Sequence, residues 1–343
     1  MSNAMWYEKL GENSDIVVST RIRLARNLKD LPFPRSLKNK DSAEVINRVK
    51  SAVSSNEVLL KNKFKYIDVS KLNKINKLTL LEHHLISPDL AGSEKETGLI
   101  VSEDESVSIM INEEDHLRLQ VMDASFDLEK IYSTADFIDS ALDKTLHFAF
   151  DDALGYLTQC PTNLGTGMRA SLMLHLPALK KSNIINKITS NLLKLGLTIR
   201  GIYGEGTEPI GDMYQLSNQV TLGLSEKEAI KNLKDIASQL IKEEQKARNE
   251  LKNDLSSKDE IHRSFGILTN CVLLGSYEFM NLISNVRLGI AIGEIKNLDF
   301  NIINKLIMNV QSASILYNYG ETLSGKEQNK IRADIVKSTL VQK

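Results

Sequence analysis

Apolar residues recur at three- and four-residue steps through several long stretches of the chain. Between Asp127 and Phe150 they form the stripe of an amphipathic helix, and residues 41–60 have the same periodicity. Another helix is predicted from Ser225 to about Leu251, because Ser225 and Glu228 have the spacing of a capping box. Each of these segments predicts a helix with one buried face.

Short segments between these helices have the composition of β-strands. Residues 98–101 and 107–111 form two strand-like runs joined by the polar turn 102–105. Residues 67–69, 78–81 and 197–203 are also strand-like, and residues 213–222 resemble another strand pair that includes Gln219-Val220-Thr221. Strands separated by helices and tight turns predict an α+β fold.

The pattern changes at Leu224, after which nearly every periodic segment is helical. Residues 253–257 are predicted to be a linker, and helices are predicted over 259–274, 276–295, 299–317 and 325–341, the last with a capping box from Ser324 to Glu327. We therefore expect a mixed domain over residues 5–252 and a small all-helical domain over 258–343. Residues 1–4 have the form of a tag-cleavage remnant before Met5.

Composition narrows the class of protein. The 343 residues are 42% apolar and 25% charged, with a formal net charge of -1, so no overall field attracts nucleic acid or a membrane surface. No apolar run approaches the roughly 20 residues of a membrane span, and no signal segment opens the chain. Cys160 and Cys271 lack metal-site spacing, which fits a reducing cytoplasm. Any anion site must therefore be a local cluster of arginines.

Five arginines lie next to predicted strands or turns: Arg21, Arg23, Arg118, Arg169 and Arg200. Arg21 and Arg23 are two residues apart on one strand, so both side chains point to the same side. Guanidinium forks suit phosphate oxygens, and the turn Gly165-Thr166-Gly167 could expose backbone N–H groups to an oxyanion. One such arginine is usually a solvated charge. Five together favour a site that holds a triphosphate while a guanidinium reacts.

Other candidate residues are ordinary when taken alone. The acidic run Glu113-Glu114-Asp115 is usually a solvated loop, Cys160 a small buried hydrophobe, and His84 a satisfied histidine. Their neighbours change the interpretation, because Arg118 follows the acidic run and a glycine-rich turn follows Cys160. The chain has no Walker A loop, no protein-kinase signature and no paired-cysteine or zinc-protease motif.

Three segments together resemble the ATP:guanido phosphotransferases, the creatine and arginine kinase family. Cys160–Gly167 with Arg169-Ala170-Ser171 is similar to the family signature, Asn112–His116 to its acidic motif, and Ser19–Arg23 to its first arginine strand. The match covers residues 15 to 250 approximately, with the motifs in family order. It implies a phosphagen-kinase-like catalytic domain, with an antiparallel sheet flanked by helices.

The order of the domains resembles one branch of this family, the bacterial protein arginine kinases. Arg21 stands almost at the start of the chain, and the helical domain follows the catalytic one. The resemblance implies transfer of the γ-phosphoryl of Mg-ATP to arginine side chains of proteins. Two alternatives stay open: a kinase for free arginine or another small guanidino compound, and a non-catalytic regulator that binds phosphoarginine.

The resemblance also implies a role for each matching residue. Glu114 would be the base, Glu205 would hold the other guanidino nitrogens, and Cys160 would lie against the guanidino group as a thiolate. The five arginines would clamp the phosphates, and His84 would help to bind the nucleotide. Mg²⁺ would be held mostly by phosphate oxygens and water, without a dedicated metal site. The full nucleotide-binding set is Ser19, Thr20, Arg21, Ile22, Arg23, His84, Arg118, Arg169, Ala170, Ser171, Leu172, Met173, Arg200, Gly201, Ile202, Tyr203, Gly204 and Glu205.

One motif departs from the family pattern. Protein arginine kinases carry Arg-Asp-x-x-Arg-Ala in the helical domain as an allosteric phosphoarginine site, whereas this chain has Gln328, Asn329, Arg332 and Ala333 at those positions. We expect weakened regulation with the chemistry intact. The resemblance further implies a homodimer and three partners: a zinc-binding activator, a stress-response repressor and a Clp-type unfoldase that degrades the marked proteins.

Overall fold

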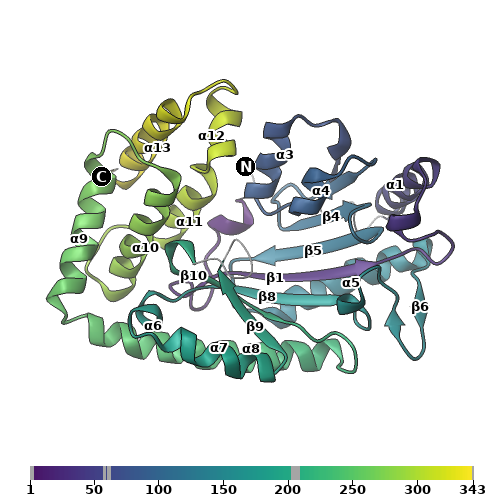
Figure 1. The fold of residues 1–343 in the computed structure, drawn as a ribbon, viewed down its shortest axis with the longest axis horizontal. Helices are drawn as coiled ribbons and strands as arrows, with labels where there is room; N and C mark the ends of the chain where they lie inside the picture. The colour runs from purple at the N-terminus through teal and green to yellow at the C-terminus, as the bar shows by residue number, and fades with distance from the viewer. Residues whose placement is uncertain (1–3, 57–58, 60–62, 202–208, 342–343) are drawn as a thin grey trace.

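A computed structural model of the chain describes residues 4–56, 59, 63–201 and 209–341 (Figure 1). Within these residues, eight strands form one antiparallel sheet in the order β2-β3-β4-β5-β1-β8-β10-β9. The strands are β1 Val17–Arg26, β2 Lys65–Asp68, β3 Gly98–Val101, β4 Val107–Ile111, β5 Leu117–Asp123, β8 Met168–His175, β9 Leu197–Gly201 and β10 Met213–Asn218. A small hairpin, β6 Phe150–Asp151 with β7 Gly155–Tyr156, lies apart from this sheet.

Helices cover one face of the sheet. The apolar stripes of α1 (Asn39–Ser54), α5 (Leu128–Leu146) and α8 (Glu226–Leu251) pack with sheet residues such as Ile22 and Leu172 into the main hydrophobic core. The shorter helices α6 (Pro177–Lys181) and α7 (Ile184–Lys194) lie near α8 along the lower edge of the molecule in Figure 1. Burial of these stripes holds the sheet on this side.

The C-terminal helices have a core of their own. They are α9 Leu255–Asn270, α10 Ser276–Ile292, α11 Phe300–Asn309, α12 Ser312–Tyr319 and α13 Gly325–Leu340. This group stands at one end of the sheet (Figure 1), and α12 packs on α3 (Lys74–Glu82), which is followed by the short α4 (Pro88–Gly92). No helix among the described residues is long and apolar enough to cross a membrane.

Most of the predicted elements are present. The hairpin over 98–111, the helix after Asp127 and the long helix after Ser225 all form, and both predicted capping boxes are made. The fold class is also confirmed: an α+β arrangement with an antiparallel sheet flanked by helices, followed by a helical part.

Two strand predictions were wrong. Residues 78–81 belong to α3, because the Asn73 side chain accepts a hydrogen bond from the Asn76 N–H and starts a helix there. Residues 213–222 form only the single strand β10, which ends at Asn218. Gln219-Val220-Thr221 is not a strand: the Thr221 hydroxyl instead donates to the carbonyls of Thr162 and Leu164.

Two boundaries in the helical part also differ from the prediction. The helix predicted over 299–317 is divided into α11 and α12, because the Glu82 carboxylate accepts the Ala313 and Ser314 N–H groups and so caps a new helix. The linker predicted over 253–257 is shorter, since the Asp254 side chain caps α9 at Leu255.

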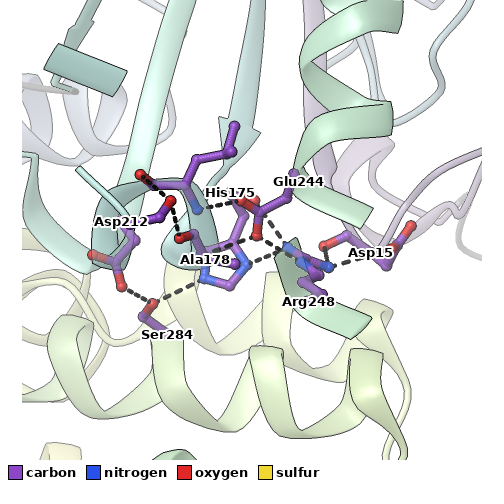
Figure 2. Close-up of polar contacts among 9 residues, drawn as sticks. Asp15, His175, Ala178, Asp212, Glu244, Arg248 and Ser284 are labelled. Carbon is purple, nitrogen blue, oxygen red and sulfur yellow. Dashed lines mark hydrogen bonds and ion pairs between the residues drawn. The ribbon is translucent and has the colours of Figure 1, made fainter. Parts of the chain in front are cut away.

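A buried polar network joins the sheet to the helical part (Figure 2). Arg248 of α8 lies 2.7 Å from Glu244 and donates to the carbonyl of His175, at the end of β8. His175 Nε2 lies 2.9 Å from the Ser284 hydroxyl of α10, and this hydroxyl donates its hydrogen to Asp212. Burial next to Arg248 holds the pKa of His175 well below its usual value, so this histidine is neutral. The network therefore fixes the sheet against the C-terminal helices.

Candidate active site

A cavity of about 500 Å³ lies over the face of the sheet opposite the main core. Its floor is formed by alternate residues of β1, β5, β8 and β10. Residues of the α3–α4 segment, including His84 and Ser87, form one wall, and residues of α10 and α11 form another. The size lies within the ~300–1,000 Å³ of typical small-molecule sites.

Strand alternation directs the arginines of β1 into this cavity. Arg21 and Arg23 line it, whereas Ile22 between them is fully buried in the core on the other face. Across the strands, Arg23 is paired with Gln120 of β5 and with Arg169 of β8. Arg118 of β5 also lines the cavity. The predicted arginines therefore gather on one face because the antiparallel register places them in neighbouring rows.

Arg21 and Arg23 form no ion pair with a carboxylate among the described residues. Burial, followed by the charges of Arg118 and Arg169, lowers the pKa of Arg21 to about 10. Burial, followed by the charges of these arginines with Arg21 first, holds the pKa of Arg23 well below its usual value, and Glu113 opposes the shift. Among the described residues, the buried Nε atoms of Arg23 and Arg169 have no hydrogen-bond partner. Half-buried like charges with unpaired donors are costly until an anion binds to them.

Arg118 connects this cluster to the acidic loop. Its Nη1 lies 2.6 Å from Glu113 Oε1, and its Nη2 lies 3.3 Å from Glu114 Oε2. The Asn163 side chain also donates to Glu114 Oε2, at 3.4 Å. Burial raises the pKa of Glu114 above its usual value; the Arg118 charge opposes the rise, and neighbouring carboxylates add to it. A partly exposed carboxylate with a raised pKa suits the role of a proton acceptor.

The rest of the acidic motif is structural. Asp115 is buried, and its Oδ1 accepts hydrogen bonds from the Asn27 side chain and from the Gln159 N–H. His116 Nδ1 accepts from the Leu28 N–H, and burial lowers the pKa of this histidine to about 4. These bonds hold the loop that carries Glu114 against the segment that leads into Cys160.

Cys160 begins the turn that carries Asn163. Its Sγ lies 3.0 Å from Thr162 Oγ1. Burial, followed by the charges of Arg200 and Arg118, lowers the pKa of Arg169, and the nearby Cys160 opposes this shift. In the glycine-rich turn after Cys160, the Thr166 N–H is donated to the Thr221 carbonyl, so this one group of the turn is not available to an oxyanion. Gly165 has a φ of +104°, and a Cβ atom there would lie 2.3 Å from the Thr221 oxygen. Glycine is needed there for close backbone packing.

The structure separates the remaining predicted nucleotide residues into two groups. Ser19, Ser171, Met173 and His84 line the cavity. The side chains of Thr20, Ile22, Ala170 and Leu172 are instead buried on the other face of the sheet, because they alternate with the cavity residues.

His84 and Arg200 occupy particular positions. His84 has a left-handed backbone with φ of 59°, and burial beside Arg21 lowers its pKa to about 4, so it is neutral. Arg200, near the end of β9, does not line the cavity, but its charge lowers the pKa of Arg169. Gly201 ends β9, and the predicted residues Ile202, Tyr203, Gly204 and Glu205 lie outside the described residues.

Sequence reasoning missed two polar residues of the cavity floor. Gln215 Oε1 accepts a hydrogen bond from Arg21 Nη2 at 2.9 Å, and Gln120 donates to the His84 carbonyl at 2.7 Å. Each is a single polar residue between apolar neighbours on a strand. That alternation was visible in the sequence, but the cross-strand register that brings them to the arginines was not.

The altered C-terminal motif contains a buried arginine. Arg332 donates to the carbonyls of Val310 and Leu274, to Asn329 Oδ1 and to the Ser312 hydroxyl. Ala333 is fully buried. The Arg332 guanidinium thus holds the turn between α11 and α12 in place.

Comparison with known sequences agrees with the geometry of the site. The family of the ATP:guanido phosphotransferase C-terminal catalytic domain matches residues 44–247, and the protein-arginine kinase McsB C-terminal domain matches residues 254–343. A protein-arginine kinase of Clostridium acetobutylicum is 44% identical over 98% of this chain and 99% of its own length. One of Caldanaerobacter subterraneus subsp. tengcongensis is 42% identical over 96% of this chain and 98% of its own.

Solved structures of related kinases are similar to this chain at lower sequence identity. A lombricine kinase is 27% identical with a TM-score of 0.61, over 71% of this chain and 69% of that chain. A duplicated taurocyamine kinase from Schistosoma mansoni is 29% identical with a TM-score of 0.59, over 67% of this chain and 33% of that one. The chain belongs to the ATP:guanido phosphotransferase family, and within it to the protein-arginine kinases.

Proposed function

We propose that this protein transfers the γ-phosphoryl group of Mg-ATP to the guanidino group of arginine side chains in other proteins. The observation that carries the proposal is the cluster of half-buried arginines, with Arg21 and Arg23 lacking a carboxylate partner among the described residues, near a carboxylate of raised pKa. A polyphosphate supplies the negative charge that this cluster lacks. Phosphoryl transfer depends mainly on such positioning and charge stabilisation.

In this mechanism the arginines hold the phosphates and Glu114 handles the proton. A guanidinium is a poor nucleophile because its lone pairs are delocalised and its pKa exceeds about 12. Glu114 takes a proton from it as a nitrogen attacks the γ-phosphorus. The new N–P bond forms while the bond from the γ-phosphorus to the β-phosphate oxygen breaks, and ADP leaves. Arg118 is paired with Glu113 and Glu114, and so it positions the base next to the arginines that hold the phosphates.

The other predicted residues have supporting roles in this proposal. Cys160 contacts the guanidino group as a thiolate, Glu205 holds its remaining nitrogens, and neutral His84 contacts the nucleotide without adding to the positive charge. Mg²⁺ enters with ATP as part of the substrate. As the family resemblance implies, phosphate oxygens and water are expected to hold most of its coordination sites.

Glu114→Gln tests the role of the base. It should lower transfer by about 10²–10⁴-fold, the usual contribution of a general base, while ADP binding stays near wild type. Loss of ADP binding in a folded variant would show that the acidic loop is structural instead. Phosphorus NMR at neutral pH, with either an arginine-rich protein or free arginine as acceptor, separates the candidate substrates. A phosphoramidate signal on free arginine would favour the small-substrate alternative.

The proposal also concerns regulation at the altered C-terminal motif and the partners of the protein. Arg332 is buried and donates to four protein acceptors, which supports weakened phosphoarginine binding at the altered motif. An activation by phosphoarginine that depends on Arg332 would contradict this. The zinc-binding activator, the stress-response repressor, the Clp-type unfoldase, the homodimer and the cytoplasmic location stay predictions from the family resemblance.

A further inference from the structure

One serine of the α3–α4 segment contacts the acidic loop directly. The Ser87 hydroxyl donates a hydrogen bond to Glu113 Oε1, and its oxygen accepts the Leu90 N–H at 3.0 Å as the cap of α4. A hydroxyl has a single hydrogen to donate. Because the cap uses the oxygen as an acceptor, that hydrogen is directed to the carboxylate. Ser87 is therefore bound on both sides, at the point where it lines the cavity.

Apolar packing fixes the place of Ser87. Three residues close to it in the chain are buried in one hydrophobic cluster with Met110 of β4: Leu85, Ile86 and Leu90. Glu113 follows Met110 by three residues. The same cluster therefore holds both the serine and the strand that leads into the acidic loop.

Glu113 is a buried carboxylate with two donors on one oxygen. Its side chain is 0% exposed, and Oε1 accepts from Ser87 and from Arg118 Nη1, the latter at 2.6 Å. Its Oε2 is also buried and has no hydrogen-bond partner among the described residues. A buried carboxylate is costly unless donors compensate its charge. Without the serine, this carboxylate would keep Arg118 as its one donor among the described residues.

Arg118 is shared between Glu113 and the base. Its Nη2 lies 3.3 Å from Glu114 Oε2, a longer contact than the one that Nη1 makes to Glu113. The guanidinium is planar, so a rotation moves both nitrogens together. The longer contact is the weaker one and is lost first when Glu113 changes its position.

We infer that Ser87 is a positioning residue for the proton transfer. Its hydroxyl fixes the carboxylate of Glu113, which in turn fixes the direction of the Arg118 guanidinium. The guanidinium then holds Glu114 at the place where it takes the proton. This inference rests on the proposed function. It adds a residue that acts on the base through two others.

The charges around Glu114 provide a readout that a merely structural serine would not change. After burial, four charged groups act on the Glu114 pKa: Arg118, Asp115, Glu113 and Asp89. Of these, Arg118 lowers the pKa and the three carboxylates raise it. If Arg118 turns away from Glu114, the pKa of Glu114 rises further, so activity is lost at a higher pH on acidification.

Ser87→Ala removes the donor. It should lower kcat for transfer to an arginine-rich protein about 10- to 100-fold, the effect of one hydrogen bond to a charged group. The acidic limb of the kcat profile should also move to higher pH. Ser87→Thr keeps the hydroxyl and should restore most of both. Ser87→Gly removes the hydroxyl as well, but glycine is accepted at a helix cap, so it provides the same test if alanine weakens α4.

Ser324→Ala is a matched control. Ser324 caps α13, where it accepts the Glu327 N–H and donates to Glu327 Oε2 at 2.7 Å, and it does not line the cavity. It therefore makes the same pair of bonds as Ser87 outside the site. Any general effect of losing a helix cap should appear in its urea unfolding, with kcat and the pH profile close to wild type.

The outcomes distinguish the two proposals. If the wild-type protein is active and both Ser87→Ala and Ser87→Gly keep its kcat and pH profile, this inference is wrong and the proposed function stands. A lower kcat with an unchanged pH profile and no recovery in Ser87→Thr would make Ser87 structural, which also overturns the inference. If the wild-type protein transfers no phosphoryl group to arginine, the proposed function fails and this inference fails with it.

Discussion

Arg23 and Arg26 lie three residues apart on strand β1, yet their surroundings are opposite. Arg26 is buried with its charge fully matched: it lies 2.8 Å from Asp139, donates to the Ala25 and Thr166 carbonyls and stacks 3.4 Å from the centre of the Tyr156 ring. Arg23 faces other arginines across the strands, and its Nε lacks a partner among the described residues.

The same contrast holds between the cavity face and the network of Figure 2. There, Arg248 is satisfied by Glu244, Asp15 and the His175 carbonyl. Buried arginines with carboxylate partners, such as Arg26 and Arg248, hold parts of the fold together. Arg21 and Arg23 in the cavity lack such partners among the described residues and are available to bind an anion. Burial alone therefore does not identify a functional arginine. The informative property is a guanidinium held away from bulk water without a compensating charge.

The largest expected effect is on Arg23 itself. Arg23→Gln should lower kcat/KM by about 10³–10⁵-fold, the range for an arginine that stabilises the transferring phosphoryl group. Stability should be equal or higher, because a buried repulsion is removed. Steady-state kinetics and urea unfolding measure the two quantities. Arg23→Lys keeps the charge but loses the guanidinium fork, so its kcat/KM should lie between those of wild type and Arg23→Gln. A clear loss of stability in Arg23→Gln would place Arg23 with the structural arginines.

Arg248→Met should lower stability and leave turnover nearly unchanged, the reverse of Arg23→Gln. Removing one partner of a buried ion pair costs about 3–5 kcal/mol, because the buried Glu244 is left without its cation. Urea unfolding measures this loss. The double variant Arg248→Met with Glu244→Gln should recover part of it. Turnover per folded molecule should stay near wild type, and a selective loss of turnover would remove the distinction between the two regions.

Ligand binding should stabilise the protein through the cavity arginines. ADP at 100 times its dissociation constant is expected to add about 2.7 kcal/mol to the free energy of unfolding. The effect should shrink in Arg23→Gln at the same ADP concentration and persist in an Arg248 variant that still folds. Thermal unfolding with and without ADP makes the comparison, and equal shifts in both variants would contradict it.

The smallest expected effect concerns pH and Glu114. The pKa of Glu114 is raised in the folded state, so folding favours its protonated form. The contribution of Glu114 to stability is therefore complete below pH 4.5 and is lost as pH rises through the folded pKa. Glu114→Gln should therefore gain stability relative to wild type on going from about pH 4 to pH 7. Activity should fall on acidification at a higher pH than an ordinary glutamate would give. Urea unfolding at both pH values checks the sign.

Much of the site could be predicted from the sequence because its residues lie in short local motifs. Arg21 and Arg23 share a face through strand periodicity, and Arg118 follows Glu114 by four residues. Local pattern failed where a distant contact decided the structure. Glu82 divides a predicted helix by capping Ala313 and Ser314, and Thr221 leaves its predicted strand to bind two carbonyls of the Cys160 turn.

The sequence by itself determined the elements, the family and the residues that carry the chemistry, because helix periodicity, capping boxes and motifs are local properties of the chain. Only the tertiary structure decided which arginines have a carboxylate partner and which do not. It places Asp139 beside Arg26 and Arg169 beside Arg23, and both neighbours come from distant parts of the chain. It also brought Trp6 and α11 to the wall of the cavity. Register and packing join residues that are hundreds of positions apart, and no local pattern records them.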